Sequence, residues 1–197
     1  LIASLIFYAW GEPLYVLLLL LNSLVNYGFA FIIRRKGMLA LSVVFNIGLL
    51  AVFKYTVFFI GTINGLLGIS IAIPAIPLPI GISFYTFQAM SYVIDVYRGT
   101  VDAQKRYDRF LLYLAFFPQL IAGPIVKYRD IAEQLDHREM TFENTASGVA
   151  RFVTGLAKKL LLANSMAVVV DRLFDVEPFS FVGSWLVAVA YVFQIYF

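Results

Sequence analysis

Three polar side chains with helical spacing are the residues of this chain best placed to act together on a substrate. Gln88, Tyr92 and Asp95 occupy positions i, i+4 and i+7 of an otherwise apolar stretch, so a helix would place them on one face. An amide, a phenol and a carboxyl group offer both donors and acceptors to a polar ligand. The face fits either the wall of a substrate channel or hydrogen bonds to a neighbouring helix, and the spacing does not decide between them.

Further polar groups extend this candidate surface along the chain. Residues 116–124 (FFPQLIAGP) contain Pro118 and Pro124, which interrupt a helix within an apolar segment. In a membrane the freed backbone groups must be satisfied by protein or water, so the segment fits either a simple kink or the lining of a binding site. The predicted channel-lining residues are Ser83, Tyr85, Gln88, Tyr92, Asp95 and Gln119.

Two isolated ionisable residues carry a weaker signal for chemistry. Lys54 follows Met38 by roughly 24 Å of helix, close to the far membrane interface, which favours a side chain that snorkels to water. His137 is the only histidine and lies in a charged segment, which favours a solvated side chain. No metal-ligand cluster, phosphate-binding glycine loop or nucleophile–histidine–carboxylate set can be assembled around it. The chain is therefore predicted to contain neither a catalytic residue nor a metal site.

The composition indicates that these residues sit in a membrane. Hydrophobic residues make up 61% of the chain and charged residues 14%, with a mean hydropathy of +0.85. Globular proteins average about 45–50% apolar and about 25% charged residues. Residues 55–94 contain no charge at all, which is enough for two crossings of a hydrocarbon core about 30 Å thick. The basic residues form no aromatic-interleaved polar patch, so nucleic acid is not an expected partner.

The hydropathy pattern predicts an all-α, multi-pass integral membrane protein. Two basic groups, Arg34 to Lys36 and Arg98 to Arg109, follow predicted spans and favour the same cytoplasmic side. Both ends of the chain are abruptly apolar, which predicts a single membrane domain over residues 1–197, truncated at both ends. The expected elements are spans at 13–33, 38–63 and 80–97, an apolar or re-entrant loop at 66–79, a short span or hairpin at 110–126, an interfacial helix at 127–143, a helix at 148–174 and a final segment from 179.

Several strings of residues resemble the membrane-bound O-acyltransferase family. The longest is residues 78–98 (LPIGISFYTFQAMSYVIDVYR), followed by 117–129 (FPQLIAGPIVKYR), 155–160 (GLAKKL) and 53–55 (FKY). They are most similar to the branch that acetylates polysaccharides such as alginate, and the likeness runs through essentially the whole chain.

The resemblance implies part of a ring of membrane helices around a thinned centre, with broken or re-entrant segments and funnels from both faces. It implies an enzyme of the plasma membrane that transfers O-acetyl groups to hydroxyls of an extracellular polysaccharide. The donor is a co-substrate whose acetyl group comes ultimately from acetyl-CoA or an acyl carrier, and no bound cofactor is expected. The implied partners are the lipid bilayer, the polysaccharide and an extracytoplasmic acetyltransferase. The family histidine is expected beyond Phe197, so His137 receives no catalytic role and the fragment alone is expected to be inactive.

Three alternatives remain open at the level of sequence. A related chemistry is D-alanyl transfer to teichoic acid, which the strings at 84–88 (FYTFQ) and 119–124 (QLIAGP) favour less. The broken segments also fit a transporter or channel. A structural membrane scaffold is the third alternative, and it predicts that replacing Gln88 or Asp95 by Leu leaves activity unchanged.

Overall fold

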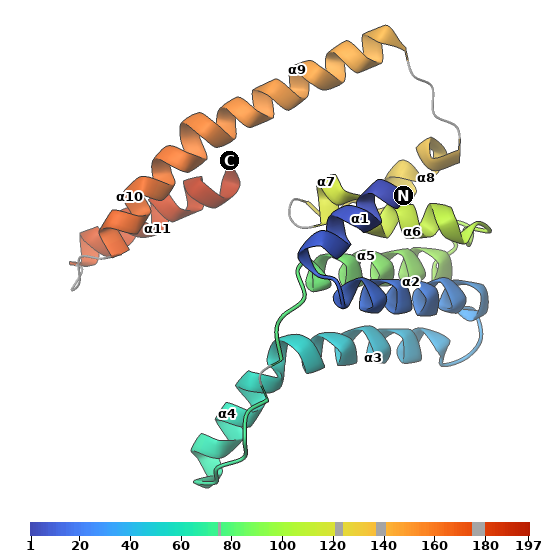
Figure 1. Ribbon diagram of the computed structural model, residues 1–197, viewed down its shortest axis with the longest axis horizontal. Helices are drawn as coiled ribbons and strands as arrows, with labels where there is room; N and C mark the ends of the chain where they lie inside the picture. The colour runs from blue at the N-terminus through green and yellow to red at the C-terminus, as the bar shows by residue number, and fades with distance from the viewer. Residues whose placement is uncertain (75, 121–123, 137–140, 175–179) are drawn as a thin grey trace. The chain divides into compact units, whose positions relative to one another are not determined.

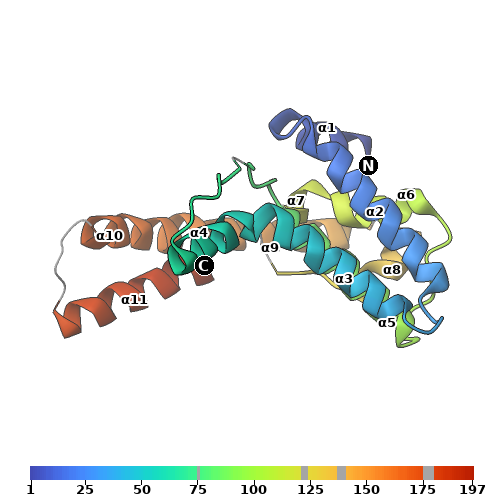
Figure 2. The same cartoon turned by 90° about the horizontal axis from the view of Figure 1, so that it is seen from below.

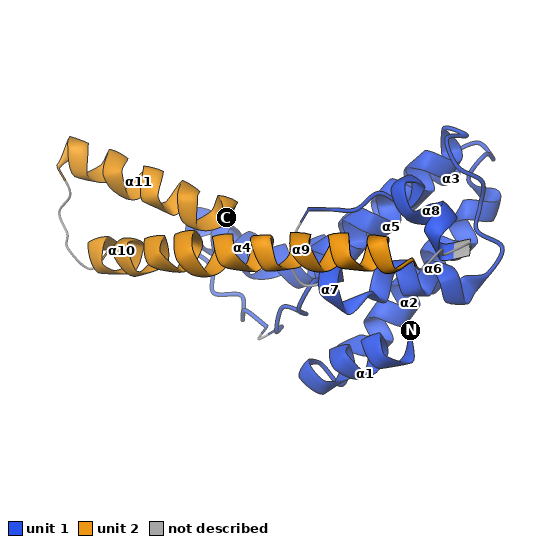
Figure 3. Cartoon of the chain, turned by 90° about the horizontal axis from the view of Figure 1, so that it is seen from above, with its two compact units in different colours: residues 1–138 blue, residues 139–197 orange. Residues whose placement is uncertain are grey.

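The computed structural model describes residues 1–74, 76–120, 124–136, 141–174 and 180–197, so His137 lies outside the described residues. Within these ranges the secondary structure is helical and contains no strand (Figure 1). The all-α fold class predicted from sequence is confirmed. The chain divides into two compact units, residues 1–138 and residues 139–197, coloured separately in Figure 3. Each unit is described by itself below.

Unit 1 is a bundle built around one buried helix, α5. Residues Ile82 to Tyr97 of α5 pack against α2, α3, α6 and α8. Three fully buried residues of α5, Tyr85, Ala89 and Val93, show how completely it is enclosed. The elements of this unit are α1 (Ile2–Gly11), α2 (Tyr15–Ile32), α3 (Met38–Leu50), the π-helical turn η1 (Ala51–Tyr55), α4 (Thr56–Leu67), α5 (Ile82–Tyr97), α6 (Tyr107–Ala115), α7 (Phe117–Leu120) and α8 (Tyr128–Asp136).

Helices α2 and α5 run parallel, and contacts at their two ends establish this. The Tyr8 hydroxyl donates to the Ile80 carbonyl at 3.0 Å, which joins the end of α1 to the start of α5. The Arg34 guanidinium lies beside Gly99, which joins the end of α2 to the end of α5. The α2–α3 and α5–α6 connections therefore lie at one end of the bundle, as Figure 1 also shows. We call this the basic end, because it carries Arg34, Arg35, Lys36, Arg98, Lys105, Arg106 and Arg109.

An aromatic cluster fills the core near the basic end. The Tyr92 ring lies 4.6 Å from the Phe110 ring and 4.8 Å from the Tyr128 ring, centroid to centroid. Tyr113 lies 5.2 Å from Tyr128 in an edge-on arrangement. Such pairs contribute roughly 0.5–1.5 kcal/mol each beyond the area they bury. They fix the short helices α6 and α8 against α5.

Helix α3 continues through η1 into α4 as one helical segment, Met38 to Leu67. The sequence predicted an end near Ile63, and the helix runs one turn further before Gly68 adopts a left-handed conformation with φ of 64°. Asn64 then holds the returning chain, because its side chain both donates to the Ile71 carbonyl and accepts from the Ile71 N–H at 2.9 Å. The apolar loop predicted at 66–79 is thus confirmed from Ile69 onward, apart from residue 75, which lies outside the described residues.

Among the described residues, three helices are long and apolar enough to cross a membrane: Tyr15–Ile32, Met38–Leu67 and Phe142–Phe174. The first two match the predicted spans, and the third begins six residues earlier than its predicted start at 148. The predicted span at 80–97 is observed as α5, whose 16 residues reach roughly 24 Å. This is shorter than a hydrocarbon core about 30 Å thick.

The predicted boundaries differ most between residues 107 and 143. Helix α6 begins at Tyr107, before the predicted 110, and stops at Ala115 because Phe116 is extended. Pro118 then lies within the four-residue helix α7. The interfacial helix predicted at 127–143 is observed only as α8, which ends at Asp136. Phe142 already belongs to the next helix, α9, so the expected single element is divided.

Unit 2 is a long helix followed by a helix that returns alongside its end. It consists of α9 (Phe142–Lys158), the π-helical turn η2 (Lys159–Ala163), α10 (Asn164–Phe174) and α11 (Phe181–Tyr196). The Thr141 hydroxyl accepts from the Asn144 N–H at 3.1 Å and starts α9. The Ser180 hydroxyl does the same for α11, accepting from the Gly183 N–H. Helix α11 packs on α10 and η2, and Figures 1 and 2 show the two helices as a hairpin.

Candidate functional site

The polar face of α5 is buried, as its spacing predicted. Gln88 is 2% exposed, Tyr92 is fully buried and Asp95 is 7% exposed. Tyr85 is also fully buried, whereas Ser83 is partly buried. These side chains are enclosed by the helices of unit 1, so any substrate path along them would pass through the interior of this bundle. Their role as channel-lining residues stays a prediction.

Several buried polar atoms of α5 have no hydrogen-bond partner among the described residues. Gln88 (Oε1) and Asp95 (Oδ2) belong to the polar face, whereas Thr86 (Oγ1) lies on the opposite side of the helix. A buried polar atom without a partner costs roughly 1–3 kcal/mol. Such atoms are retained where they bind water or a polar ligand, so this stretch of α5 is the strongest candidate for a functional surface in unit 1.

Gln119, the last predicted channel-lining residue, lies apart from the other candidates. It lines a cavity of about 190 Å³ between α6, α7 and α8, together with Tyr113 and Phe116. Its side-chain amide donates to the Tyr113 carbonyl at 2.8 Å. That bond satisfies a carbonyl at the end of α6, so Gln119 acts locally as a cap for the interrupted helix.

Three buried asparagines form a hydrogen-bonded clamp that was not predicted from sequence. Asn46 of α3 donates to Asn26 of α2 at 2.8 Å, and Asn26 donates back to Asn46 at 3.1 Å. Asn22 also donates to Asn46, at 3.3 Å. All three are at most 1% exposed. The signal was present in the sequence, because Asn22 and Asn26 lie at i and i+4 within an uncharged span and therefore share a face.

Tyr92 has a defined contact at the basic end. Its hydroxyl accepts the Gln104 backbone N–H at 2.8 Å. The Gln104 side chain in turn donates to the Tyr128 hydroxyl at 2.8 Å and accepts the Arg106 N–H at 3.1 Å. Tyr27 donates to the Lys105 carbonyl at 2.8 Å. Three of these bonds hold the loop between α5 and α6 against the bundle, and the Gln104–Arg106 bond lies within the loop.

Lys54 lies inside the π-helical turn η1 and is exposed. Its ammonium nitrogen is 5.7 Å from the centroid of the Tyr55 ring, within the range of a cation–π interaction. Single π-helical turns occur frequently at functional sites. The turn was not predicted, and the assignment of Lys54 as a snorkelling side chain stays a prediction.

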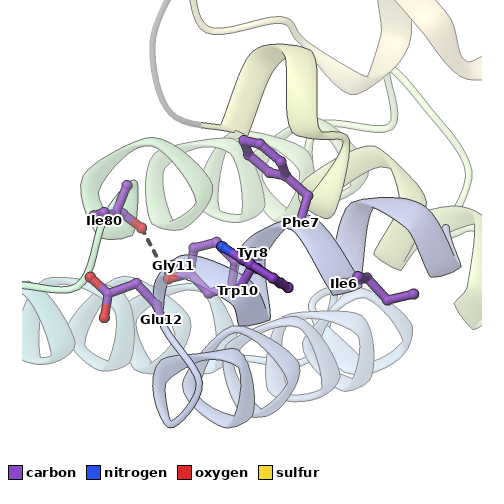
Figure 4. A pocket seen from close by; sticks show the side chains of 7 residues that line it. All are labelled: Ile6, Phe7, Tyr8, Trp10, Gly11, Glu12 and Ile80. Atoms are coloured by element: carbon purple, nitrogen blue, oxygen red, sulfur yellow. Dashed lines mark hydrogen bonds between the residues drawn. The ribbon is translucent and has the colours of Figure 1, made fainter.

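A recess lies at the end of the bundle opposite the basic end. It encloses about 360 Å³ and is lined by residues of α1, the turn after it and the start of α5 (Figure 4): Ile6, Phe7, Tyr8, Trp10, Gly11, Glu12 and Ile80. The Tyr8 hydrogen bond to Ile80 crosses it. Its walls are mainly apolar, and the polar groups of its lining side chains are the Glu12 carboxylate, the Trp10 indole N–H and the Tyr8 hydroxyl, which is bonded to Ile80.

The described residues contain no group of three or more His, Cys, Asp or Glu side chains that could hold a metal ion. No nucleophile and base lie together in the contacts above. The geometry of the described residues therefore identifies buried polar surfaces and no set of catalytic groups.

Residues 106–197 match the model of MBOAT, the membrane-bound O-acyltransferase family. The chain belongs to this family. The family assignment made from the strings at 78–98 and 117–129 is thereby confirmed, as is the multi-pass, all-α membrane class. The family match itself covers α6 to α11.

Several relatives are similar to this chain over all or nearly all of its 197 residues. The "Probable alginate O-acetylase AlgI" of Pseudomonas aeruginosa is 37% identical over 209 residues, which cover 100% of this chain and 40% of that protein. The protein of the same name from Azotobacter vinelandii is 37% identical over 207 residues, covering 99% and 42%. The "Peptidoglycan O-acetyltransferase" of Helicobacter pylori is 31% identical over 231 residues, covering 100% and 44%. The chain thus spans about two fifths of these relatives, and no solved structure gives a significant match.

Proposed function

We propose that the protein containing this chain is a membrane O-acetyltransferase that esterifies hydroxyl groups of an extracellular polysaccharide. The observation that carries the proposal is the similarity along the entire chain to proteins named for acetylation of alginate and of peptidoglycan. Both names specify an acetyl group as the transferred group and a glycan as the acceptor. They favour acetyl transfer over D-alanyl transfer and over transport without acyl chemistry.

In this reaction the described residues would guide and enclose substrates. A general base beside the acceptor hydroxyl contributes about 10²–10⁴-fold, and the described residues supply no base in such a setting. We therefore assign catalysis to another part of the protein and expect this chain alone to be inactive. The predicted channel-lining set is proposed to bound the path of the acetyl group: Ser83, Tyr85, Gln88, Tyr92, Asp95 and Gln119.

The proposed location is the plasma membrane with the basic end on the cytoplasmic side. Arg34 to Lys36 and Arg98 to Arg109 meet at that end of unit 1, which supports one common side for both loops. The acetyl donor, derived from acetyl-CoA or an acyl carrier, would arrive there. The polysaccharide and an extracytoplasmic acetyltransferase would act on the opposite side.

The test is a gene deletion in the source organism, followed by measurement of ester-linked acetate and D-alanine on the isolated surface polymers. We expect polysaccharide acetate to fall to background and D-alanine to stay constant, with acetate restored by the full-length gene. Restoration by the 197-residue chain alone would contradict the assignment of catalysis elsewhere. Unchanged acetate in the deletion strain would overturn the proposed function.

A further inference from the structure

Helix α9 of unit 2 carries a polar, basic stripe along one side. Its members follow one another at alternating intervals of three and four residues, so they share one face of the helix. Lys159 lies directly beside this stripe, and the one carboxylate of α9 is Glu143 in the first turn. The stripe is therefore positively charged. We call it the basic stripe of α9: Asn144, Ser147, Arg151, Thr154 and Lys158.

The opposite side of α9 is apolar and exposed. No side chain of α9 is buried among the described residues, and the returning helix α11 packs on α10 and η2. Figure 1 shows α9 extending beyond this hairpin. An exposed apolar face of this length is suited to contact with a membrane or with another protein surface. Its members are Val149, Phe152, Val153, Leu156 and Leu160.

The spacing of the charges does not suit a crossing of the membrane by α9. A helix that crosses a hydrocarbon core about 30 Å thick needs about 20 predominantly apolar residues. The continuous helix Phe142–Phe174 is long enough, yet its longest uncharged run is residues 160–170, which lie beyond α9. A crossing by α9 would carry Arg151 and Lys158 into hydrocarbon, where charged side chains are rare and costly. A helix lying flat keeps both cations among the headgroups.

The basic stripe contains an open recess of about 420 Å³. Gly155 lies between Arg151 and Lys158 along the chain, and a Cβ atom at Gly155 would meet nothing within 4 Å, so the space beside it is empty of protein. The two cations and the Ser147 hydroxyl offer hydrogen-bond donors to an anion. The residues that line the recess are Ser147, Ala150, Arg151, Thr154, Gly155 and Lys158.

We propose that α9 lies along the membrane surface, with its apolar face in the bilayer and its basic stripe bound to headgroups of anionic phospholipids. A basic amphipathic helix binds a membrane through buried apolar area and through attraction to anionic lipid. The headgroup phosphate occupies the recess, where Arg151 and Lys158 donate to its oxygens. This inference does not depend on the acetyl transfer proposed above.

The first test measures the depth of the apolar face in lipid bilayers. The full-length protein is used, with any cysteine outside residues 1–197 replaced by serine, since this chain contains none. A bimane fluorophore is attached to Val149→Cys or Leu156→Cys, and its quenching by lipids brominated at different acyl positions gives its depth. These residues lie seven apart on one face, about 10 Å along the helix axis.

We expect nearly equal, shallow depths for Val149→Cys and Leu156→Cys. The matched control is Leu17→Cys and Leu24→Cys, which are also exposed and seven residues apart on the predicted span α2. Their depths should differ by about 10 Å. A similar difference on α9 would show that α9 crosses the bilayer and would overturn the proposal. Failure of both α9 positions to be quenched would place the apolar face against protein and contradict the proposal equally.

The second test compares quenching of the Leu156→Cys fluorophore by brominated phosphatidylglycerol and by brominated phosphatidylcholine. We expect phosphatidylglycerol to be enriched at α9, and added sodium chloride to reduce this enrichment. Arg151→Gln and Lys158→Gln should each lower it about fivefold, the effect of one basic residue at an anionic surface. Lys36→Gln, which removes a cation from unit 1, should leave it unchanged.

Arg151→Lys separates a loss of charge from a loss of structure, because it keeps the cation and should retain most of the enrichment. If Arg151→Lys lowered the enrichment as much as Arg151→Gln, the charge argument would fail. Equal quenching by the two lipids in the protein with native Arg151 and Lys158 would also overturn the proposal.

Discussion

Gly81 shows how one residue determines the approach of two helices. It precedes α5 with φ of 75°, a conformation that L side chains rarely adopt. A Cβ atom at this position would lie 2.6 Å from the Leu120 carbonyl oxygen at the end of α7. That oxygen belongs to the backbone and cannot rotate away. The start of α5 therefore requires glycine for two independent reasons.

Gly81→Ala is expected to destabilise unit 1 by about 2 kcal/mol or more, since a left-handed residue alone costs roughly 1–2 kcal/mol. The measurement is the thermal midpoint of the full-length protein in detergent. Gly61→Ala is the matched control, because a Cβ there meets nothing within 4 Å on helix α4. It should be neutral or stabilising by up to about 1 kcal/mol. Equal midpoints for the two variants would contradict the close approach of α5 to Leu120.

Tyr92 acts on the α5–α6 connection through its hydroxyl. Tyr92→Phe keeps the ring packing and removes the acceptor of the Gln104 N–H. We expect amide hydrogen exchange across residues 99–106 to accelerate about fivefold, the effect of losing one hydrogen bond of about 1 kcal/mol. Tyr97→Phe is the control, since Tyr97 is 47% exposed. Unchanged exchange in Tyr92→Phe would show that the hydroxyl does not hold this loop.

At the scale of elements, the asparagine clamp joins α2 to α3. Asn46→Leu should destabilise the protein by about 1–2 kcal/mol, because Asn22 and Asn26 then keep buried groups without their partner. Asn26→Leu combined with Asn46→Leu should cost less than the sum of the single changes. The check is a double-mutant cycle on the unfolding of the full-length protein. Strict additivity would mean that the two side chains do not interact.

Sequence reasoning located most helices and made no prediction of how they pair. The span ending at Ile33 is confirmed because hydropathy and the following basic residues are local signals. The π-helical turns were missed because they depend on packing along the whole helix. The Asn22–Asn26 pair was overlooked because its neighbours on α3 are distant in sequence. Phe116 ends α6 ahead of Pro118, as the residues before a proline often do, so this helix stops well before the end predicted at 126.

The candidate site was predicted only in part, because the sequence carries its local helical spacing but not its contacts with distant helices. A shared face for Gln88, Tyr92 and Asp95 follows from helical periodicity, and the structure buries all three. What that face meets depends on α2, α3 and α8, which no local pattern encodes. Gln119 was grouped with these residues because it lies near a helix break, and the structure places it beside Tyr113 in a separate cavity.

At the scale of the whole molecule, the arrangement of unit 1 makes a prediction about sidedness. The connections after α2 and α5 lie at one end of the bundle, with Arg34 beside Gly99. The turn that contains Glu12 lies at the other end, where Tyr8 meets Ile80. If the bundle lies across the bilayer, Lys36 and Asp102 must share a side, and Glu12 must face the opposite side.

This prediction can be tested with introduced cysteines, because the chain contains none. Lys36→Cys and Asp102→Cys should react with an impermeant maleimide in inside-out membrane vesicles, and Glu12→Cys should react in right-side-out vesicles. Lysed vesicles show that each position can be labelled. If all three cysteines reacted from the opposite sides, the basic end would lie outside. That result would contradict the charge argument and leave the fold unchallenged. Labelling of Lys36→Cys and Asp102→Cys from opposite sides would contradict the fold itself, since the α2–α3 and α5–α6 connections could then not meet.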